Sequence, residues 1–404
     1  MRGSFAAAAE VFGKSSKTCE RVWKRYYSTL DDNGVGGDMK AHRKNHCGRK
    51  KRPAEDYAKI ANVPYHQRGT LRALSAATGI PLATLHSAKK ARDGSITART
   101  LTKKLPLSLN QRKQHVHFCL QHVLPSGLFD PCFTDVHIDE KWFNLTRTET
   151  RVYMLPDEVP IQQTVRNKLH IPKIMFMCAV ARPRHDHHNN RDWDGLIGIW
   201  PYVCWQAAIR NSVNQPRGTM EMKAINSVTA AHHRAMMIDN VIPAIKQKWP
   251  TRRQTIRIQQ DNCRVHTAVV DRQILAAANV DGWNMELCRQ PPRSPDLNVL
   301  DLGFFNLIQS IQHTHASHNL PEFFQAVQRS FTWGQRDGTT LNKVCLSWQS
   351  VMIDVLQTDG MNDSPLRHMG KDSMLRRGAL PAAIECPAEL IESGREFIRG
   401  WEPE

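Results

Sequence analysis

The stretch RQPPRSPDLNVLDLGFFNLIQS, residues 289–310, changes midway from a loop to a helix. Its first half contains three prolines, which fix the backbone φ angle and lack an amide donor, so no regular element can run through it. From Asp301 onward, Phe304, Ile308 and Ile311 recur at helical spacing and predict a helix with one buried face. Asp301 therefore lies near a helix N-terminus, where a carboxylate is electrostatically favoured. It is either a helix-capping residue or a metal ligand.

The length and composition indicate an intracellular protein with more than one domain. The 404 residues suffice for two or three domains, and no apolar run approaches the roughly 18 residues of a membrane span. The ten cysteines include no C-x-x-C pair, which argues against a zinc ribbon or a disulfide framework and favours reduced thiols. We expect no membrane association.

The positive charge is concentrated in the N-terminal third. Residues 1–130 contain 24 Lys and Arg against 9 Asp and Glu, whereas the remainder contains 31 against 29. A basic region joined to a nearly neutral body indicates a polyanion such as double-stranded DNA as the partner of that region.

Residues 6–27 predict a helix, a tight turn at Gly13 and a second helix capped by Ser15 or Ser16. The second helix is expected to turn Cys19, Val22, Trp23 and Tyr26 inward and four basic residues outward, namely Lys17, Arg21, Lys24 and Arg25. This arrangement is typical of a helix-turn-helix that inserts its second helix into a DNA groove. The unit starts almost at Met1, which leaves open that it is incomplete.

Residues 70–90 predict a second helix-turn-helix. Leu71, Leu74 and Ala77 form an apolar stripe before Gly79, and after the turn the stripe resumes at Leu82 and Leu85, with Pro81 suited to the first turn of the second helix. The side chains expected to contact DNA are Thr84, His86, Ser87, Lys89 and Lys90. A short helical hairpin without a DNA role is the alternative.

Between these units, the linker around residues 39–53 carries Arg49, Lys50, Lys51 and Arg52. Such a run can follow DNA phosphates or act as a nuclear import signal, and a merely solvated charge run is the alternative.

From about residue 132 the pattern changes to short strands mixed with helices. We predict strands at 136–139, 151–155, 173–180, 195–202, 257–260 and 283–287, a polar loop at 182–194, and helices at 230–249 and 265–279. This order predicts a mixed α/β sheet flanked by helices.

Three carboxylates stand out on these elements: Asp139 inside the first strand, Asp261 at the end of another, and Asp301 at a helix start. An acid buried in a covered strand requires a compensating cation, and oxygen ligands favour Mg²⁺ or Mn²⁺ over zinc. Asp135 shares the strand parity of Asp139, and Glu140 faces the other way; both are secondary candidates. Spacing alone does not decide between a metal site and three unrelated acids.

Three blocks carry a resemblance: HIDEKWF (137–143), IQQDNCRVHT (258–267) and RSPDLNVLDLGFF (293–305). They are similar to the catalytic blocks of transposases of the mariner superfamily. The 39 residues between Asp261 and Asp301 resemble the interval of its plant-type branch.

The resemblance implies an RNase H-like catalytic domain preceded by an all-α tandem helix-turn-helix region. It implies a catalytic and metal-binding triad of Asp139, Asp261 and Asp301, supported by Asn262 and His266, with Mg²⁺ as cofactor and Mn²⁺ as an alternative. The expected activity is cut-and-paste transposition in the nucleus: binding to terminal inverted repeats, cleavage of phosphodiesters and joining to a TA target, carried out by a homodimer.

The expected organisation comprises six parts: a helix-turn-helix (1–30), a basic linker (31–56), a second helix-turn-helix (57–92), a connector helix (93–131), the catalytic domain (132–320) and a C-terminal helical region (321–404). Two alternatives remain open. The first is a domesticated or inactive transposase that acts as a sequence-specific DNA-binding protein. The second is a structure-specific nuclease of the same fold.

Overall fold

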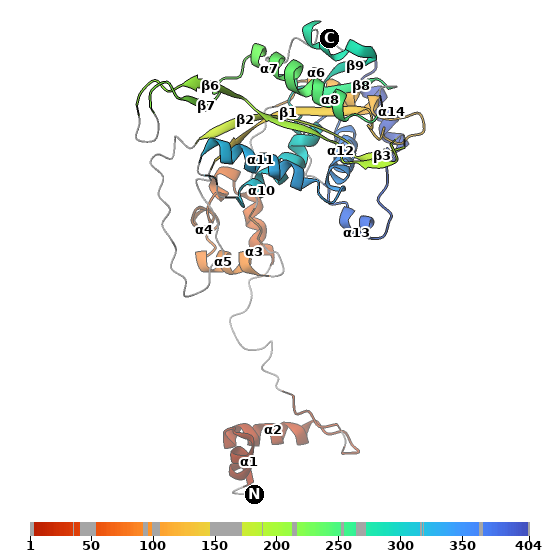
Figure 1. The fold of residues 1–404 in the computed structure, drawn as a ribbon. Coiled ribbons are helices and arrows are strands. Elements are labelled where there is room, and N and C mark those ends of the chain that lie inside the picture. Colours follow the sequence, from red (N-terminus) through yellow and green to blue (C-terminus); the bar gives the residue numbers. More distant parts are fainter. Residues whose placement is uncertain are drawn as a thin grey trace. The chain divides into compact units, whose positions relative to one another are not determined.

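The computed structural model divides the chain into two compact units, Met1–Thr102 and Lys103–Glu404 (Figure 1). The structure describes residues 4–34, 36–40, 54–91, 96–98, 106–145, 172–187, 189–211, 216–251, 254–263, 272–315, 317, 319–362 and 367–402. The division falls inside the connector expected over 93–131, and the finer domain boundaries stay a prediction. Among the described residues, no helix combines the length and hydrophobicity needed to cross a lipid bilayer.

The chain begins with two helices, α1 (Ser4–Phe12) and α2 (Ser16–Ser28), as the sequence predicts. The side chain of Ser15 caps α2 by accepting a hydrogen bond from the Thr18 amide. The inward orientation predicted for Trp23 is wrong: its side chain is 47% exposed and contacts only the rims of Phe5 and Tyr27. Two short helices offer too little surface to cover an indole.

Arg25 also departs from the outward orientation predicted for it. It is half-buried, and its Nε donates a hydrogen bond to the carbonyl oxygen of Asp38, 3.3 Å away. The guanidinium of Arg25 therefore holds the segment that follows α2 against the helix.

A second helical group has its own small core. It contains α3 (Ala54–Ala58), the 3-10 turns η1 (Lys59–Asn62) and η2 (Tyr65–Arg68), α4 (Leu71–Thr78) and α5 (Leu82–Lys90). Val63, Leu74, Ile80 and Leu85 form the core. The predicted helix pair at 70–90 is confirmed, with Gly79 in the left-handed region at φ +69° ending α4.

Three details of this second pair differ from the prediction. Ala77, in α4, is exposed. Pro81 is the N-terminal cap of α5 and does not lie in its first turn. Because α5 begins at Leu82, this leucine is at the end of the helix and is 40% exposed. The buried stripe of α5 is therefore Leu85 and Ala88, three residues apart on one helix face.

The larger unit is built on a five-stranded mixed sheet with the strand order β5-β2-β1-β8-β9 (Figure 1). The strands are β1 (Asp135–Asn144), β2 (Lys173–Ala181), β5 (Leu196–Pro201), β8 (Ile256–Gln260) and β9 (Met285–Arg289). β1, β2 and β5 are antiparallel neighbours, whereas β8 lies parallel to β1 and β9 parallel to β8. The predicted mixed sheet is confirmed; β9 begins two residues later than predicted.

Two small hairpins accompany the sheet: β3 (Arg184–Asp186) with β4 (Arg191–Trp193), and β6 (Val203–Ala207) with β7 (Met220–Ala224). The polar loop predicted over 182–194 is therefore wrong. Arg184 explains the difference, because its guanidinium lies 4.7 Å from the centre of the Trp193 ring and 4.6 Å from that of Trp249. These cation–π contacts attach the hairpin to Trp249 through Arg184 and Trp193, while most of its polar side chains stay exposed. The strand predicted at 151–155 lies outside the described residues.

Helices cover both faces of the sheet (Figure 1). One face packs against α6 (Leu109–Gln121), α10 (Phe305–Gln312), α11 (Leu320–Gly334), α12 (Thr340–Gln357) and α14 (Ala388–Phe397). The other packs against α7 (Ala230–Met236), the π-helical turn η4 (Met237–Val241), α8 (Ile242–Lys248) and α9 (Arg272–Ala278). The remaining short elements are η6 (Val280–Gly282), η7 (Pro295–Leu297), η8 (Leu300–Phe304) and α13 (Lys371–Arg376).

The helix predicted over 230–249 exists as α7, η4 and α8 without a break. Of the helix predicted over 265–279, the described part begins at Arg272.

Candidate active site

Asp139 lies in the middle of the central strand β1, and only 9% of its surface is exposed. Its face of the strand is shared with His137 and Phe143 and points toward the layer of α10, α11 and α12. Burial raises the pKa of Asp139 well above its usual range, and the negative charges of Asp301 and Glu140 raise it further. A strand interior that holds an acid under these conditions favours a bound cation.

Asp301 approaches Asp139 from a different element. It is the second residue of the π-helical turn η8, which continues directly into α10. Burial raises the pKa of Asp301, while the positive charge of Lys141 and a hydrogen-bond interaction with Asp139 act in the opposite direction. The two carboxylates therefore influence each other's pKa, although Asp139 is buried and Asp301 is exposed.

Asn298, not Asp301, caps this helix. The Asn298 Oδ1 accepts a hydrogen bond from the Leu300 amide at 2.9 Å, and its main-chain oxygen accepts one from the Leu302 amide at 2.9 Å. Its Nδ2 donates to the Asp139 Oδ2 at 3.0 Å, and the residue is 2% exposed. The amide thus ties the start of the Asp301 helix to the Asp139 carboxylate. No prediction from the sequence covered Asn298, although an Asn before an apolar helix is a capping signal.

Asp261 follows β8 directly, and β8 is the parallel neighbour of β1. Its Oδ1 accepts a hydrogen bond from the Cys263 amide at 3.1 Å, which bends the chain away from the strand. The charge of Asp261 raises the pKa of both Asp139 and Asp301. The structure therefore brings all three predicted acids within electrostatic reach of one another at one edge of the fold.

The three carboxylates do not form a tight cluster. In the part of the chain that the structure describes, one group of His, Cys, Asp or Glu side chains has all its donor atoms within 4.8 Å of one another, and it contains none of these three acids. The donor set is oxygen only, which fits Mg²⁺ or Mn²⁺ better than zinc. Asp139 is buried, Asp261 is half-buried and Asp301 is exposed.

Of the two residues predicted to support Asp261, the structure describes only Asn262. It is exposed beside Asp261. His266 lies outside the described residues. Glu140 faces the opposite side of the sheet, as predicted, where it accepts hydrogen bonds from Tyr202 at 3.3 Å and His233 at 3.1 Å.

The proline-rich loop before η8 is anchored to the sheet and to α12. The carbonyl oxygen of Leu297 accepts hydrogen bonds from Gln259 Nε2 in β8, at 3.0 Å, and from Trp348 Nε1 in α12, at 2.8 Å. Nearer the start of the loop, His115 Nε2 lies 2.8 Å from the Pro292 oxygen. Because β8 also delivers Asp261, these bonds fix the position of the Asp301 helix relative to the second acid.

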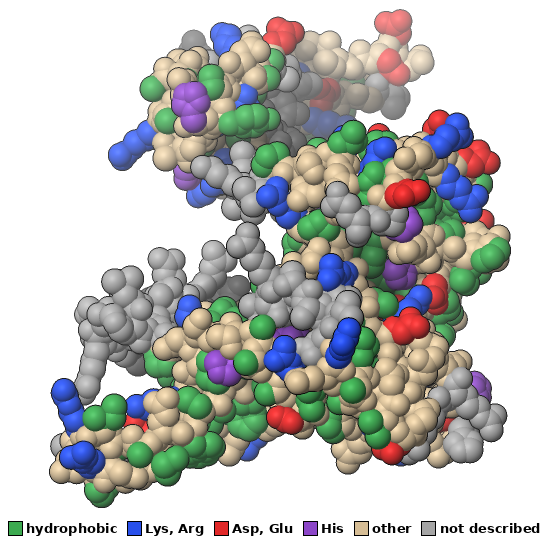
Figure 2. All heavy atoms as spheres, turned by 90° about the horizontal axis from the view of Figure 1, so that it is seen from above, with side chains coloured by type: hydrophobic (Ala, Val, Ile, Leu, Met, Phe, Trp, Pro, Cys, Tyr) green, Lys and Arg blue, Asp and Glu red, His purple; other side chains and the backbone are tan. Residues whose placement is uncertain are grey.

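The predicted DNA-binding side chains are mostly exposed. Lys17, Arg21 and Lys24 lie on the open surface of α2, and Lys24 forms an ion pair with Glu20 at 2.8 Å. His86, Ser87, Lys89 and Lys90 are exposed on α5, whereas Thr84 is half-buried. Arg49, Lys50, Lys51 and Arg52 lie outside the described residues. On the face drawn in Figure 2, the coloured Lys and Arg side chains are interspersed with hydrophobic and acidic ones.

The chain is similar to solved structures of the Mos1 transposase. Its paired-end complex with the left transposon end matches at a TM-score of 0.53 and 16% identity, over 89% of this chain and 93% of that one. The Mos1 strand transfer complex matches at 0.54 and 18%, over 90% and 93%. The mariner Mos1 paired-end complex with Mg matches at 0.53 and 17%, over 88% and 92%.

No protein-family model and no curated protein matches the chain. At these identities the structural likeness shows the fold. The predicted fold class is thereby confirmed: an RNase H-like mixed α/β domain preceded by an all-α region.

Proposed function

We propose that this protein is a DNA transposase that cuts and joins phosphodiesters at a divalent-metal site held by Asp139, Asp261 and Asp301. One observation carries the proposal. Three acids, at the centre of β1, the end of β8 and the start of the η8–α10 helix, lie within electrostatic reach of one another, and the pKa values of Asp139 and Asp301 are raised. Such an arrangement is costly unless cations compensate it.

In this proposal, Asp139, Asp261 and Asp301 bind Mg²⁺, with Mn²⁺ as an alternative. When bound, a metal pair activates the attacking hydroxyl and stabilises the leaving oxygen of phosphoryl transfer. Asn298 keeps the Asp139 carboxylate oriented through its 3.0 Å hydrogen bond. We assign supporting roles beside Asp261 to Asn262 and His266.

The DNA-binding part of the proposal rests on the two helix pairs of the basic N-terminal region. The exposed basic residues of α2 and α5 suit contacts with phosphates and groove edges. The Mos1 structures are complexes with a transposon end and a strand transfer product, which supports terminal inverted repeats as the ligand. A TA target, a homodimer that pairs two ends and a nuclear location complete the proposal. The 39-residue interval between Asp261 and Asp301 supports the plant-type mariner-like branch.

The test uses the full chain and duplex DNA taken from the two sides of its gene, where the proposal expects terminal inverted repeats. The protein should nick this DNA only when Mg²⁺ or Mn²⁺ is present, and Asp261→Asn should abolish nicking while end binding persists. Asp192→Asn is the matched control, because Asp192 is a largely exposed acid on the β3–β4 hairpin. Tight, sequence-specific binding without metal-dependent nicking would contradict the proposal and favour a DNA-binding regulator.

A further inference from the structure

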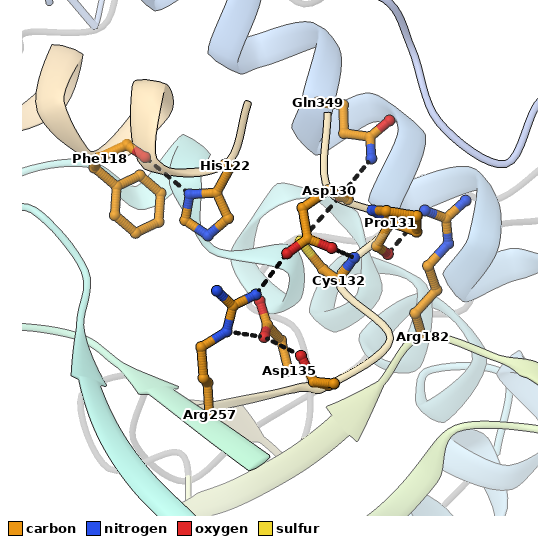
Figure 3. Close-up of polar contacts among 10 residues, drawn as sticks. Phe118, His122, Asp130, Pro131, Cys132, Asp135, Arg182, Arg257 and Gln349 are labelled. Carbon is orange, nitrogen blue, oxygen red and sulfur yellow. Dashed lines mark hydrogen bonds and ion pairs between the residues drawn. The ribbon is translucent and has the colours of Figure 1, made fainter. Parts of the chain in front are cut away.

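A second group of buried polar side chains lies at the start of β1 (Figure 3). His122 ends α6, Cys132 lies in the loop that follows, and Asp135 opens β1. Their ligand atoms all lie within 4.8 Å of one another, and the three residues are 7%, 2% and 2% exposed. Asp135 precedes Asp139 by four strand residues, so the two carboxylates are separated by about 13 Å along β1.

The main chain around this group holds the three side chains in place. The carbonyl oxygen of Phe118 accepts a hydrogen bond from His122 Nδ1 at 2.8 Å, which leaves the Nε2 lone pair available. Asp130 joins the loop to the helix, because its amide donates to the His122 oxygen at 2.7 Å. The Asp130 Oδ1 accepts a hydrogen bond from the Cys132 amide at 2.8 Å. Cys132 itself has a φ of +56°, a conformation that costs energy for a residue with a Cβ.

The charges around the group are unbalanced. Arg257 pairs with Asp130 at 2.9 Å and with Asp135 at 2.6 Å, so one guanidinium faces two carboxylates (Figure 3). Burial raises the pKa of the Cys132 thiol well above its usual range, and burial lowers the pKa of His122. A metal ligand must be a neutral imidazole, and the lowered pKa favours that form. A divalent cation that displaces the thiol proton would balance the remaining negative charge.

We propose that His122, Cys132 and Asp135 bind one zinc ion. A thiolate, an imidazole and a carboxylate are zinc ligands, whereas Mg²⁺ and Mn²⁺ favour oxygen donors, so this site and the three acids select different metals. Binding forms a zinc–sulfur bond and releases the Cys132 proton to solvent. The hydrogen bond from His122 to a main-chain oxygen is the outer contact that usually orients a zinc-bound imidazole.

Zinc takes a fourth ligand, which comes from water or from His137. Both ring nitrogens of His137 are buried. Among the described residues, neither has a hydrogen-bond partner of ordinary geometry. Gln259 lies close enough to influence the pKa of His137. His122 and His137 also contact the same ring, that of Trp348, with centroid distances of 5.0 and 5.4 Å. The ion would join the end of α6 to the start of the strand that carries Asp139.

The test is a cobalt and zinc titration of the full-length protein after treatment with a chelator. Co²⁺ bound at this site gives a thiolate-to-cobalt charge-transfer band, which a site made of carboxylates alone cannot produce. We expect about one equivalent of Co²⁺ per chain to produce the band and Zn²⁺ to abolish it. Zinc should also raise the unfolding temperature of the wild-type protein.

Cys132→Ala should lose the band and the zinc-dependent stabilisation. Cys119→Ala is the matched control, because Cys119 is a fully buried thiol on α6 outside the group, and it should retain both. A wild-type protein that gives no thiolate band with excess Co²⁺ overturns the proposal, even if the Cys132 variant fails to fold. A band that persists in Cys132→Ala overturns it as well.

Discussion

Replacing Asn298 tests the link between the Asp301 helix and the Asp139 carboxylate. In Asn298→Ala, the Leu300 amide loses its capping acceptor, which costs about 0.5–2 kcal/mol. The buried Asp139 Oδ2 also loses a donor, and a hydrogen bond to a charged group contributes about 1.5–3 kcal/mol. Because both bonds come from one side chain, we expect a combined loss of roughly 2–4 kcal/mol in the free energy of unfolding.

Asn298→Ser separates the two effects. A serine hydroxyl can still cap the helix, but its side chain is one atom shorter and cannot reach Asp139. We expect this variant to recover the capping contribution, about 1 kcal/mol, and to leave Asp139 without its donor. Urea unfolding measures both variants, and Asn284→Ala is the control because Asn284 makes an exposed hydrogen bond to Thr255 at 2.8 Å.

DNA nicking gives the second readout for the same variants. Both Asn298→Ala and Asn298→Ser should slow metal-dependent nicking, because each leaves the Asp139 carboxylate free to turn away from Asp301. An Asn298→Ala protein that unfolds within about 0.5 kcal/mol of the wild type and nicks DNA at the same rate would refute the reasoning.

Three further outcomes follow from the buried charges and the loop anchors. The pKa of Asp139 is raised above 3.8 in the folded state, so the metal-free protein should lose stability as pH rises from about that value. Mg²⁺ should therefore raise the unfolding temperature more at neutral than at acid pH. In thermal scans, Asp139→Asn should remove this pH dependence. Arg257→Met should destabilise the fold by about 3 kcal/mol in urea unfolding, because it leaves Asp135 buried and unpaired, whereas adding Asp135→Asn should recover most of the loss. Trp348→Phe should cost about 1 kcal/mol in the same assay, the low end for a lost hydrogen bond, because Gln259 still donates to the Leu297 oxygen.

The sheet could be predicted from sequence because its strands are short apolar runs in a fixed order. β2, for example, is buried at nearly every position, and its sequence KIMFMCAV shows this directly. The failure at residues 182–194 comes from tertiary contact with aromatic rings. Arg184 lies over two tryptophans and turns an apparent polar loop into a hairpin. Trp193 lies within residues 182–194, but nothing in their local pattern indicates that Trp249 is near.

The candidate site shows the same limit at the level of single residues. The three acids could be proposed because each lies on or beside a predicted element and because their sequence blocks resemble those of mariner-superfamily transposases; spacing alone does not select them. Asn298 could not, because its role depends on Asp139, which lies 159 residues earlier in the chain. The His122 group was equally hidden, since no metal-binding spacing connects His122, Cys132 and Asp135. In sequence the group consists of a single histidine, a single cysteine and an acid of secondary interest.

One strand face serves both groups. Asp135, His137 and Asp139 alternate along β1 and point to the same side, toward Trp348 and the η8–α10 helix. A slip of one residue in the pairing of β1 would turn all three to the other side and bring Val136, Ile138 and Glu140 in their place. Pairing on both edges, with β2 through Asp139 and Cys178 and with β8 through Val136 and Ile258, prevents such a slip. Arg257 pairs with Asp135 at the start of β1, alone or together with a metal ion. This contact therefore also stabilises the strand register that places Asp139 near Asp301.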